Sequence, residues 1–338
     1  MEDQPVEIIR EYSRSILMVN RRACRDEETN VRRNIVSQNV TQAVIADIAN
    51  RLKSKSAVSV SDLRTLKNGL LENPQYTEIV LNTQGAVRGL VRELTGQGSR
   101  QCVAADCLCN LSLGEERASA AVAKAAGLYL LAALDSLNVD LAITCAWTLG
   151  NMAGSGARAV SLMMSQGAVA KLAGLMTSPS DDVVDAAASA LAHFAHQMGD
   201  DFRQEHVLLI LQSLSQKKLT KSSLQLLFIL SCHRDFNESM NEELLYKIIE
   251  TTLKCMENIT ENCWDFVYSI RVLANLELNV KIYSLVLERF SSKREVMAKI
   301  LTMNEDVVNN SLLWFLGNLF NYSDNYNFFQ CLLTKNFQ

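Results

Sequence analysis

The stretch VDLAITCAWTLGNMAGSG, residues 139–156, contains the pattern on which the fold assignment depends. Its apolar residues recur at spacings of four, three and four, as expected for one face of an α-helix: Ala142, Ala146, Leu149 and Ala153. Trp147 and Asn151 lie one turn apart on a different face. Gly154 and Gly156 are typical helix stop signals. We therefore predict a helix that packs through one face and presents a Trp–Asn pair on another.

The same pattern recurs along the chain at intervals of 38 to 44 residues. With Asn151 as the reference, the equivalent positions are Asn68, Asn110, Asn151, His193, Ser231, Asn275 and Asn318. The residues two and five positions before each reference position are apolar, and the reference position is always polar. A repeat of this length is typical of armadillo and HEAT proteins.

Each repeat is predicted to contain three helices. A short helix runs from the repeated stretch to a glycine (residues 115–126 before Gly127, 157–166 before Gly167), and Gly85 is the equivalent glycine of the first repeat. A second helix follows (86–94, 128–137, 168–176), and then a turn leads into the third helix. Before the first repeat, residues 43–57 form an amphipathic helix with Val44, Ile45, Ile48 and Leu52 inward. We predict an all-α, right-handed armadillo-type solenoid of about seven three-helix repeats over residues 37–338.

The last repeat is predicted to be incomplete. A short aromatic helix with Tyr326, Phe328, Phe329 and Leu332 follows the final repeated stretch, and the chain stops at Gln338. Because a solenoid needs a polar cap at its end, we expect a truncated product with an exposed apolar edge.

Composition narrows the functional class. The 338 residues are 48% hydrophobic with only three prolines, which is typical of a folded, mostly helical chain. The net charge of −4 argues against a generic nucleic-acid binder. The nine cysteines are odd in number and include no C-x-x-C, as in an intracellular protein with reduced thiols. No secretory signal is visible, and the most apolar window, residues 118–134, contains Lys124 and Gly127 and is interpreted as a core helix.

Residues 1–36 form a separate, basic N-terminal arm. Residues 10–33 have a net charge of +3, with the basic side chains Arg10, Arg14, Arg21, Arg22, Arg25, Arg32 and Arg33. The arm is either a basic helix that docks on an acidic partner or on this protein, or a solvated, fraying helix.

Several stretches resemble the armadillo repeats of importin alpha, the adaptor family that carries nuclear-localisation signals: CAWTLGNMAGSG, SQGAVAKLAGLM and TSPSDDVVDAAASALAHFA. The resemblance covers residues 58–338 and is strongest over 99–200. It implies that third helices line a concave groove, where tryptophans stack on lysines and asparagines clamp the peptide backbone. The predicted groove residues are Asn110, Trp147, Asn151, His193, Asn275, Trp314 and Asn318. The arm weakly resembles an importin-beta-binding segment through Arg21, Arg22, Arg25, Arg32 and Arg33.

The chain also departs from this family. Four residues before the reference position, only two repeats have tryptophan, and the others have Arg64, Asp106, Ser189, Leu227 and Arg271. Missing tryptophans should weaken lysine binding, since each cation–π contact contributes about 0.5–2 kcal/mol. Arg64 and Arg271 are expected to repel a basic peptide, and Trp264 is expected to be a packing residue. DLRTLKNGLLENPQ and GAVRGLVREL are closer to a divergent importin-alpha-like branch whose name implies membrane insertion.

Other interpretations were weighed. The asparagines could instead bond free carbonyl groups or tie adjacent repeats together, at about 1 kcal/mol each. His193 and His196 offer two metal ligands, but no cysteine or carboxylate lies at ligand spacing, so no metal or cofactor is expected. HRDF at residues 233–236 lacks the other kinase motifs, and no nucleophile or paired-carboxylate set is visible. We expect a non-enzymatic adaptor of cytoplasm and nucleus that binds a protein or peptide, with importin beta as a further partner. The alternatives are a scaffold for one dedicated partner and a membrane-associated family member.

Overall fold

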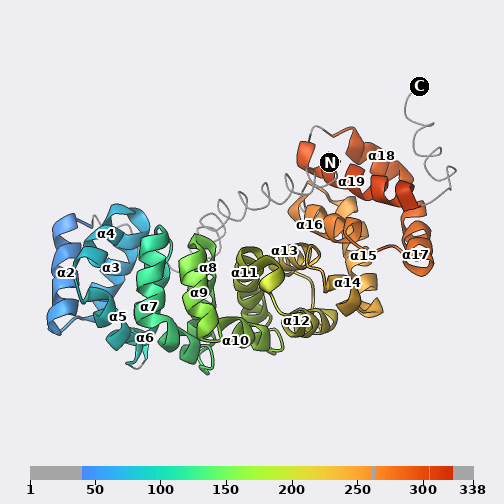
Figure 1. Cartoon of the computed structure of the whole chain (residues 1–338). Coiled ribbons are helices and arrows are strands. Elements are labelled where there is room, and N and C mark those ends of the chain that lie inside the picture. Colours follow the sequence, from blue (N-terminus) through green and yellow to red (C-terminus); the bar gives the residue numbers. More distant parts are fainter. Residues whose placement is uncertain (1–39, 97, 261–262, 304, 323–338) are drawn as a thin grey trace. The chain divides into compact units, whose positions relative to one another are not determined.

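The computed structural model describes residues 40–96, 98–260, 263–303 and 305–322, and every regular element within them is a helix. These residues form two compact units that divide between Met198 and Gly199 (Figure 1). We describe each unit by itself. The expected arm, residues 1–36, and the aromatic stretch after Asp324 lie outside the described residues.

The N-terminal unit contains an initial pair of helices, α2 and α3, followed by three repeats that end in α6, α8 and α11. Its helices are α2 (Gln42–Ser54), α3 (Val60–Glu72), α4 (Gln75–Asn82), α5 (Ala86–Leu94), α6 (Ser99–Leu111), α7 (Glu116–Ala133), α8 (Val139–Ser155), α9 (Ala157–Ser165), α10 (Ala168–Leu175) and α11 (Asp181–Met198). The third helices α3, α6, α8 and α11 pack one on the next in chain order. The contact between α8 and α11 is close, because a Cβ added to Gly150 would lie 3.0 Å from Ala190 Cα. The repeated stretches are therefore in phase, as the sequence pattern predicts.

Glycine separates the first and second helices in two of the three predicted junctions. Gly85 and Gly167 adopt left-handed backbone with φ of 101° and 82°, which favours glycine. The third prediction is wrong, because α7 continues through Gly127 instead of stopping there. An alanine-rich sequence keeps this segment helical, since one helical glycine costs only about 1 kcal/mol. Gly127 instead lets α9 approach: an added Cβ would lie 2.3 Å from Met163 Cε.

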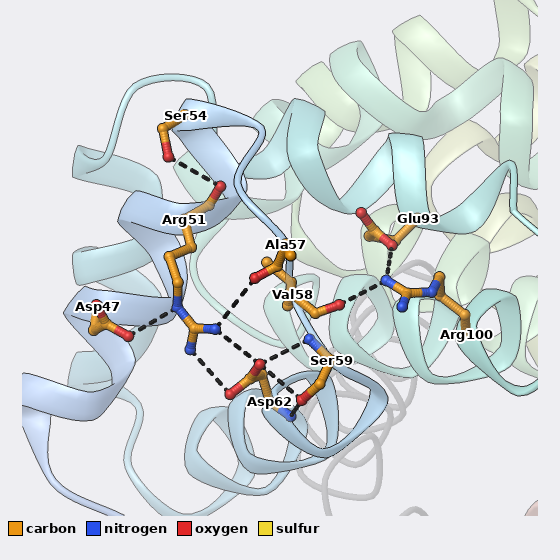
Figure 2. Close-up of polar contacts among 9 residues, drawn as sticks. All are labelled: Asp47, Arg51, Ser54, Ala57, Val58, Ser59, Asp62, Glu93 and Arg100. Carbon is orange, nitrogen blue, oxygen red and sulfur yellow. Dashed lines mark hydrogen bonds and ion pairs between the residues drawn. The ribbon is translucent and has the colours of Figure 1, made fainter.

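Two arginines fix the connection between α2 and α3 (Figure 2). The Arg51 guanidinium donates to both carboxylate oxygens of Asp62 at 2.9 Å and to Asp47 at 2.9 Å. Arg100 Nη1 donates to Val58 O and to Glu93 Oε2, both at 2.7 Å. Asp62 also accepts the backbone N–H of Ser59 at 2.7 Å in a capping box at the start of α3. In α2, Ile45, Ile48 and Leu52 are buried as predicted, but Val44 is 42% exposed.

The C-terminal unit repeats the arrangement less regularly. It contains η1 (Gly199–Asp201), α12 (Gln204–Gln216), α13 (Lys221–Leu230), α14 (Phe236–Ser239), α15 (Glu242–Glu257), α16 (Cys263–Ala274), α17 (Val280–Ser291), α18 (Arg294–Leu301) and α19 (Asp306–Tyr322). The third helices α13, α16 and α19 again pack in chain order. Outer helices are joined by ion pairs between repeats, including Arg289–Glu250 at 3.1 Å and Lys293–Glu257 at 2.6 Å. Lys247 Nζ of α15 donates to the backbone oxygens of Ser215 and Lys217 at the end of α12.

Repeats of about 42 residues, with three helices in most of them and the first two fused into α7 in one, and with third helices stacked in phase within each unit, are typical of the armadillo architecture. The chain is an all-α armadillo-type solenoid, as its periodicity predicts. Among the described residues, no helix combines the length and the apolar composition needed to cross a bilayer.

Candidate peptide-binding face

One row of side chains is left uncovered along the third helices of the N-terminal unit. From Leu141 to Gly154 of α8, every residue is buried except Trp147. From Val103 to Leu111 of α6, the exception is Asp106, and from Val183 to Ala195 of α11 the exceptions are Asp185 and Ser189. These partly exposed residues lie on three helices that pack in succession, and we call the set the inner strip: Asp106, Trp147, Asp185 and Ser189.

The inner strip contains two aspartates and one tryptophan. Asp106 and Asp185 lie on α6 and α11, the two third helices that pack against α8, which carries Trp147. Asp106 Oδ2 is 3.9 Å from Lys67 Nζ, so an ion pair joins α6 to α3 beside the inner strip. Asp140 and Asp182 are exposed in the first turns of α8 and α11, where their negative charges interact favourably with the positive end of the helix dipole.

The predicted asparagines of this unit tie one repeat to the preceding one. Asn110 Nδ2 donates to Lys67 O at 2.8 Å. Asn151 Nδ2 lies 3.4 Å from Cys109 O and 3.6 Å from Cys109 Sγ. The two asparagines are 1% and 5% exposed, and His193 in the same row is 8% exposed. Their position in phase is therefore as predicted. Their amide hydrogens bond acceptor atoms on the preceding third helix, in keeping with the alternative interpretation that the asparagines tie adjacent repeats together. Their role in holding a ligand stays a prediction.

The same tie occurs in the C-terminal unit. Asn275 Nδ2 donates to Ser231 Oγ at 2.7 Å, and Asn318 Nδ2 donates to Ala274 O at 2.7 Å. Trp314 is half-buried one turn before Asn318 in α19. Trp264 is half-buried and its ring centroid lies 5.7 Å from that of Tyr268, in keeping with the packing role predicted for it.

In the C-terminal unit, the side chains of α13 and α16 at the position equivalent to Trp147 are buried. Leu227 is fully buried and Arg271 is 3% exposed, although they occupy the position equivalent to Trp147. Arg271 Nε donates to Ser311 Oγ at 2.9 Å, and its guanidinium lies 5.4 Å from the ring centroid of Phe228. The expectation that Arg271 repels a basic peptide is wrong, because packing between third helices takes up this side chain. Arg64 of α3 is exposed, and its repulsion of a basic peptide stays a prediction.

The cysteines near Trp147 are suited to packing. Burial raises the pKa of the Cys145 thiol well above its usual range, with a smaller contribution from Cys109. Burial also raises the pKa of Cys102, whose Sγ accepts the Asn138 amide at 3.4 Å. Both thiols therefore stay protonated and weakly nucleophilic at neutral pH. In the described part of the chain, no three His, Cys, Asp or Glu side chains are grouped so that they could hold a metal ion.

Sequence reasoning missed the part played by two aspartates. Asp106 was counted only as a missing tryptophan, and Asp185 was not singled out. The signal was present, since Asp106 lies at the position of Trp147 in the neighbouring repeat and Asp185 lies one turn before Ser189. A comparison of equivalent positions in successive repeats, instead of positions along one helix, finds both aspartates.

Comparison with known proteins supports the fold. No known protein-family model matches the chain. An engineered protein of known crystal structure is similar with a TM-score of 0.62 at 22% sequence identity, over 81% of this chain and 68% of that one. A designed armadillo repeat protein is similar with a TM-score of 0.47 at 16% identity, over 81% of this chain and 99% of that one. A second designed armadillo repeat protein, in complex with the peptide (KR)4, has a TM-score of 0.46 at 17% identity, over 81% and 99% of the two chains.

Proposed function

We propose that this chain is an importin-alpha-like adaptor that binds an extended, basic peptide along the inner strip of its N-terminal unit. The observation that supports the proposal most is that Trp147 is only half-buried, on a helix whose other residues from Leu141 to Gly154 are buried, and that the flanking third helices carry Asp106 and Asp185 at partly exposed positions. A lysine or arginine laid over the indole ring gains about 0.5–2 kcal/mol from the cation–π contact. The two carboxylates add charge-assisted hydrogen bonds to the same cation or to its neighbours.

The asparagines have a supporting role in this proposal. Because Asn151 is 5% exposed and its amide hydrogen points to Cys109, it fixes α8 against α6 and so positions Trp147. Removing the tryptophan should lower affinity without lowering stability, whereas removing the asparagine should lower both.

Binding of a fluorescent lysine-rich localisation peptide, followed by anisotropy, tests the proposal. We expect Trp147→Ala to raise the Kd by about 2- to 30-fold, which corresponds to the loss of one cation–π contact. Trp314→Ala should have a smaller effect, since Arg271 and not an aspartate occupies the equivalent position of the adjacent helix α16. Tyr129→Ala, at an exposed aromatic on α7, is the matched control and should leave the Kd unchanged. Absence of binding, or equal binding by wild type, Trp147→Ala and Asn151→Ala, would count against an import adaptor.

The finer parts of the proposal concern transport. In an import adaptor, the arginines at 21, 22, 25, 32 and 33 would bind importin beta, and the protein would move between cytoplasm and nucleus. Capture of importin beta by the full chain, compared with a variant in which these five arginines are glutamines, tests this role. Failure of capture alongside intact peptide binding would favour a peptide-binding scaffold without a transport role.

A scaffold for one dedicated partner is the second candidate function. It is favoured by the burial of Leu227 and Arg271 at positions equivalent to Trp147. This burial leaves fewer sites for lysine side chains than a general signal receptor would use. The sequence also resembles transmembrane and coiled-coil domain-containing protein 6, a divergent importin-alpha-like armadillo protein. Carbonate extraction of cell membranes tests whether this chain shares the membrane association that such a name implies.

A further inference from the structure

Arg64 of α3 occupies the same repeat position as Asp106 and Trp147 of the inner strip, four residues before the reference asparagine. Its side chain is exposed, whereas its apolar neighbours Leu63 and Leu66 on the same helix are fully buried. No described residue forms a hydrogen bond or an ion pair with the Arg64 guanidinium. This side chain is therefore a cation that is available to a ligand.

Hydrogen bonds between adjacent third helices show that the equivalent positions are in register. Asn110 Nδ2 of α6 donates to Lys67 O of α3 at 2.8 Å, and Asn151 Nδ2 of α8 lies 3.4 Å from Cys109 O of α6. In both pairs, the reference asparagine contacts the residue that immediately precedes the reference position of the previous repeat. Because α3, α6 and α8 pack in succession with this same offset, the residues four positions before each asparagine lie at equivalent places on the three helices.

The charges on either side of α8 differ along the stack. On one side, α11 carries the partly exposed Asp185. On the other side, Asp106 of α6 forms an ion pair with Lys67 of α3, and Arg64 lies three residues before Lys67 without such a partner among the described residues. A peptide that lays a lysine over Trp147 therefore meets a carboxylate in one direction and an available guanidinium in the other.

We propose that the peptide bound by this chain has mixed charge, with an acidic side chain on Arg64 and a lysine or arginine over Trp147. This inference rests on the peptide-binding function proposed above and names the class of its ligand more closely. A guanidinium binds a carboxylate through two parallel hydrogen bonds, so Arg64 favours an acidic residue at one place in the peptide. A uniformly basic peptide would instead bring a like charge to Arg64.

Helix spacing predicts how far apart the two charges lie in the peptide. Adjacent packed helices are about 8–10 Å apart, so the path from α8 through α6 to α3 covers about 16–20 Å. An extended peptide advances about 3.3 Å per residue, so about five or six residues separate the acidic side chain from the lysine.

Three isomeric fluorescent peptides test the proposal by anisotropy at 50 mM salt. Each contains a core of three lysines, two glutamates, and serine and glycine elsewhere, so that net charge and long-range attraction are the same. The glutamates lie five and six residues before the middle lysine, five and six residues after it, or directly on both flanks of the core. We expect one of the two distant isomers to bind about two- to fivefold more tightly than the flanking isomer, as for an exposed ion pair.

Arg64→Gln should remove this preference and leave binding of the flanking isomer nearly unchanged. The substitution should not disturb the fold, because the Arg64 side chain is exposed and forms no bond with a described residue. Arg88→Gln, at an exposed arginine of α5, makes the same change in charge and is the matched control, so the preference should survive it. Trp147→Ala should weaken binding of all three isomers.

The outcomes separate this inference from the proposed function. Equal binding of the three isomers by the wild type, or a preference that survives Arg64→Gln, would overturn the inference, and binding that still depends on Trp147 would leave the proposed function standing. If no isomer binds in a way that depends on Trp147, the proposed function fails and the inference fails with it.

Discussion

Asn318 donates an amide hydrogen to the backbone oxygen of Ala274, one repeat earlier, and Asn110 and Asn275 make equivalent contacts in their own units. Asparagine thus has the same structural role in several repeats. It donates a hydrogen bond to a polar group of the preceding third helix, at a place where the two helices pack together. Such a bond contributes about 1 kcal/mol, and leaving its acceptor unsatisfied costs more. The row of asparagines is accordingly a feature of repeat stacking before it is a feature of binding.

This contact leads to a stability prediction. Asn318→Ala should lower the free energy of unfolding by about 1 kcal/mol, because Ala274 O loses its side-chain donor. Asn310→Ala, at an exposed position of the same helix, should be neutral or slightly stabilising because alanine has the higher helix propensity. Urea unfolding of both variants measures the difference. Equal stability of the two variants would contradict the proposed tie between repeats.

The sequence predicted where these residues lie but not what they contact. Helical periodicity placed Asn151 and Trp147 one turn apart, and both lie on the third helix as expected. Whether an amide hydrogen meets a ligand or Cys109 depends on the spacing between adjacent helices, which no pattern within one repeat encodes. For the same reason Arg271 was expected at the surface, although Ser311 and Phe228 from the neighbouring helices enclose it.

Helix bounds were predictable where glycine or a cap defines them. The second helix predicted at 86–94 is α5, with the same bounds, because Gly85 takes a left-handed conformation before it. Gly127 was misread because a glycine alone does not reveal its φ, and here it lies inside α7. Its identity is explained by the approach of Met163, a contact between helices that are about 36 residues apart in the sequence.

Two helical glycines of the N-terminal unit give a matched test of close packing. A Cβ at Gly89 of α5 would lie 2.6 Å from Leu52 O, which belongs to the backbone of α2. A Cβ at Gly174 of α10 would meet nothing within 4 Å. Gly89→Ala should therefore destabilise the protein by about 1–3 kcal/mol, whereas Gly174→Ala should stabilise it by about 0.5–1 kcal/mol. Thermal unfolding of both variants checks the opposite signs, and a stabilised Gly89→Ala protein would contradict the described α2–α5 contact.

The start of α3 gives a prediction about pH. Hydrogen bonds from the Arg51 guanidinium, with help from Ser59, hold the pKa of Asp62 well below its usual range. Because the folded state favours the ionised carboxylate, this contribution to stability is fully present above about pH 4, the usual range for an unfolded aspartate. It is lost as the pH falls through the lowered pKa of the folded state.

We therefore expect Asp62→Asn to lower the free energy of unfolding by about 1–2 kcal/mol at pH 7, since a charged hydrogen-bond partner is removed. The difference in Tm between wild type and variant should narrow as the pH is lowered from 4 towards 2. Asp47→Asn, which removes the more exposed partner of Arg51, should change stability by only a few tenths of a kcal/mol. A difference in Tm that stays constant between pH 7 and pH 2 would show that the Arg51–Asp62 contact is not the cause.

Charge at the scale of the whole chain agrees with the proposed binding of a basic peptide. The basic excess of the N-terminal arm is confined to residues 10–33, and residues 1–33 as a whole contain as many acidic as basic side chains, so the net charge of −4 lies on the remainder. Within the N-terminal unit, α8 and the third helices that pack against it carry four aspartates that are at least partly exposed: Asp106, Asp140, Asp182 and Asp185. A surface of this sign attracts cationic segments before contact, and the attraction weakens as salt shortens the Debye length.

Binding at two salt concentrations distinguishes the contribution of the carboxylates from that of the cation–π contact with Trp147. Asp106→Asn and Asp185→Asn should each raise the Kd for a lysine-rich peptide several-fold at 50 mM salt, and this effect should shrink at 300 mM because the Debye length falls from about 14 to about 6 Å. Trp147→Ala should raise the Kd by a similar factor at both salt concentrations, since contact of an ammonium with the indole ring acts at short range. Anisotropy titrations at both concentrations measure the four proteins. If the effect of Trp147→Ala disappears with salt, or the effects of the aspartate substitutions do not, the cation does not lie over Trp147 between the two carboxylates.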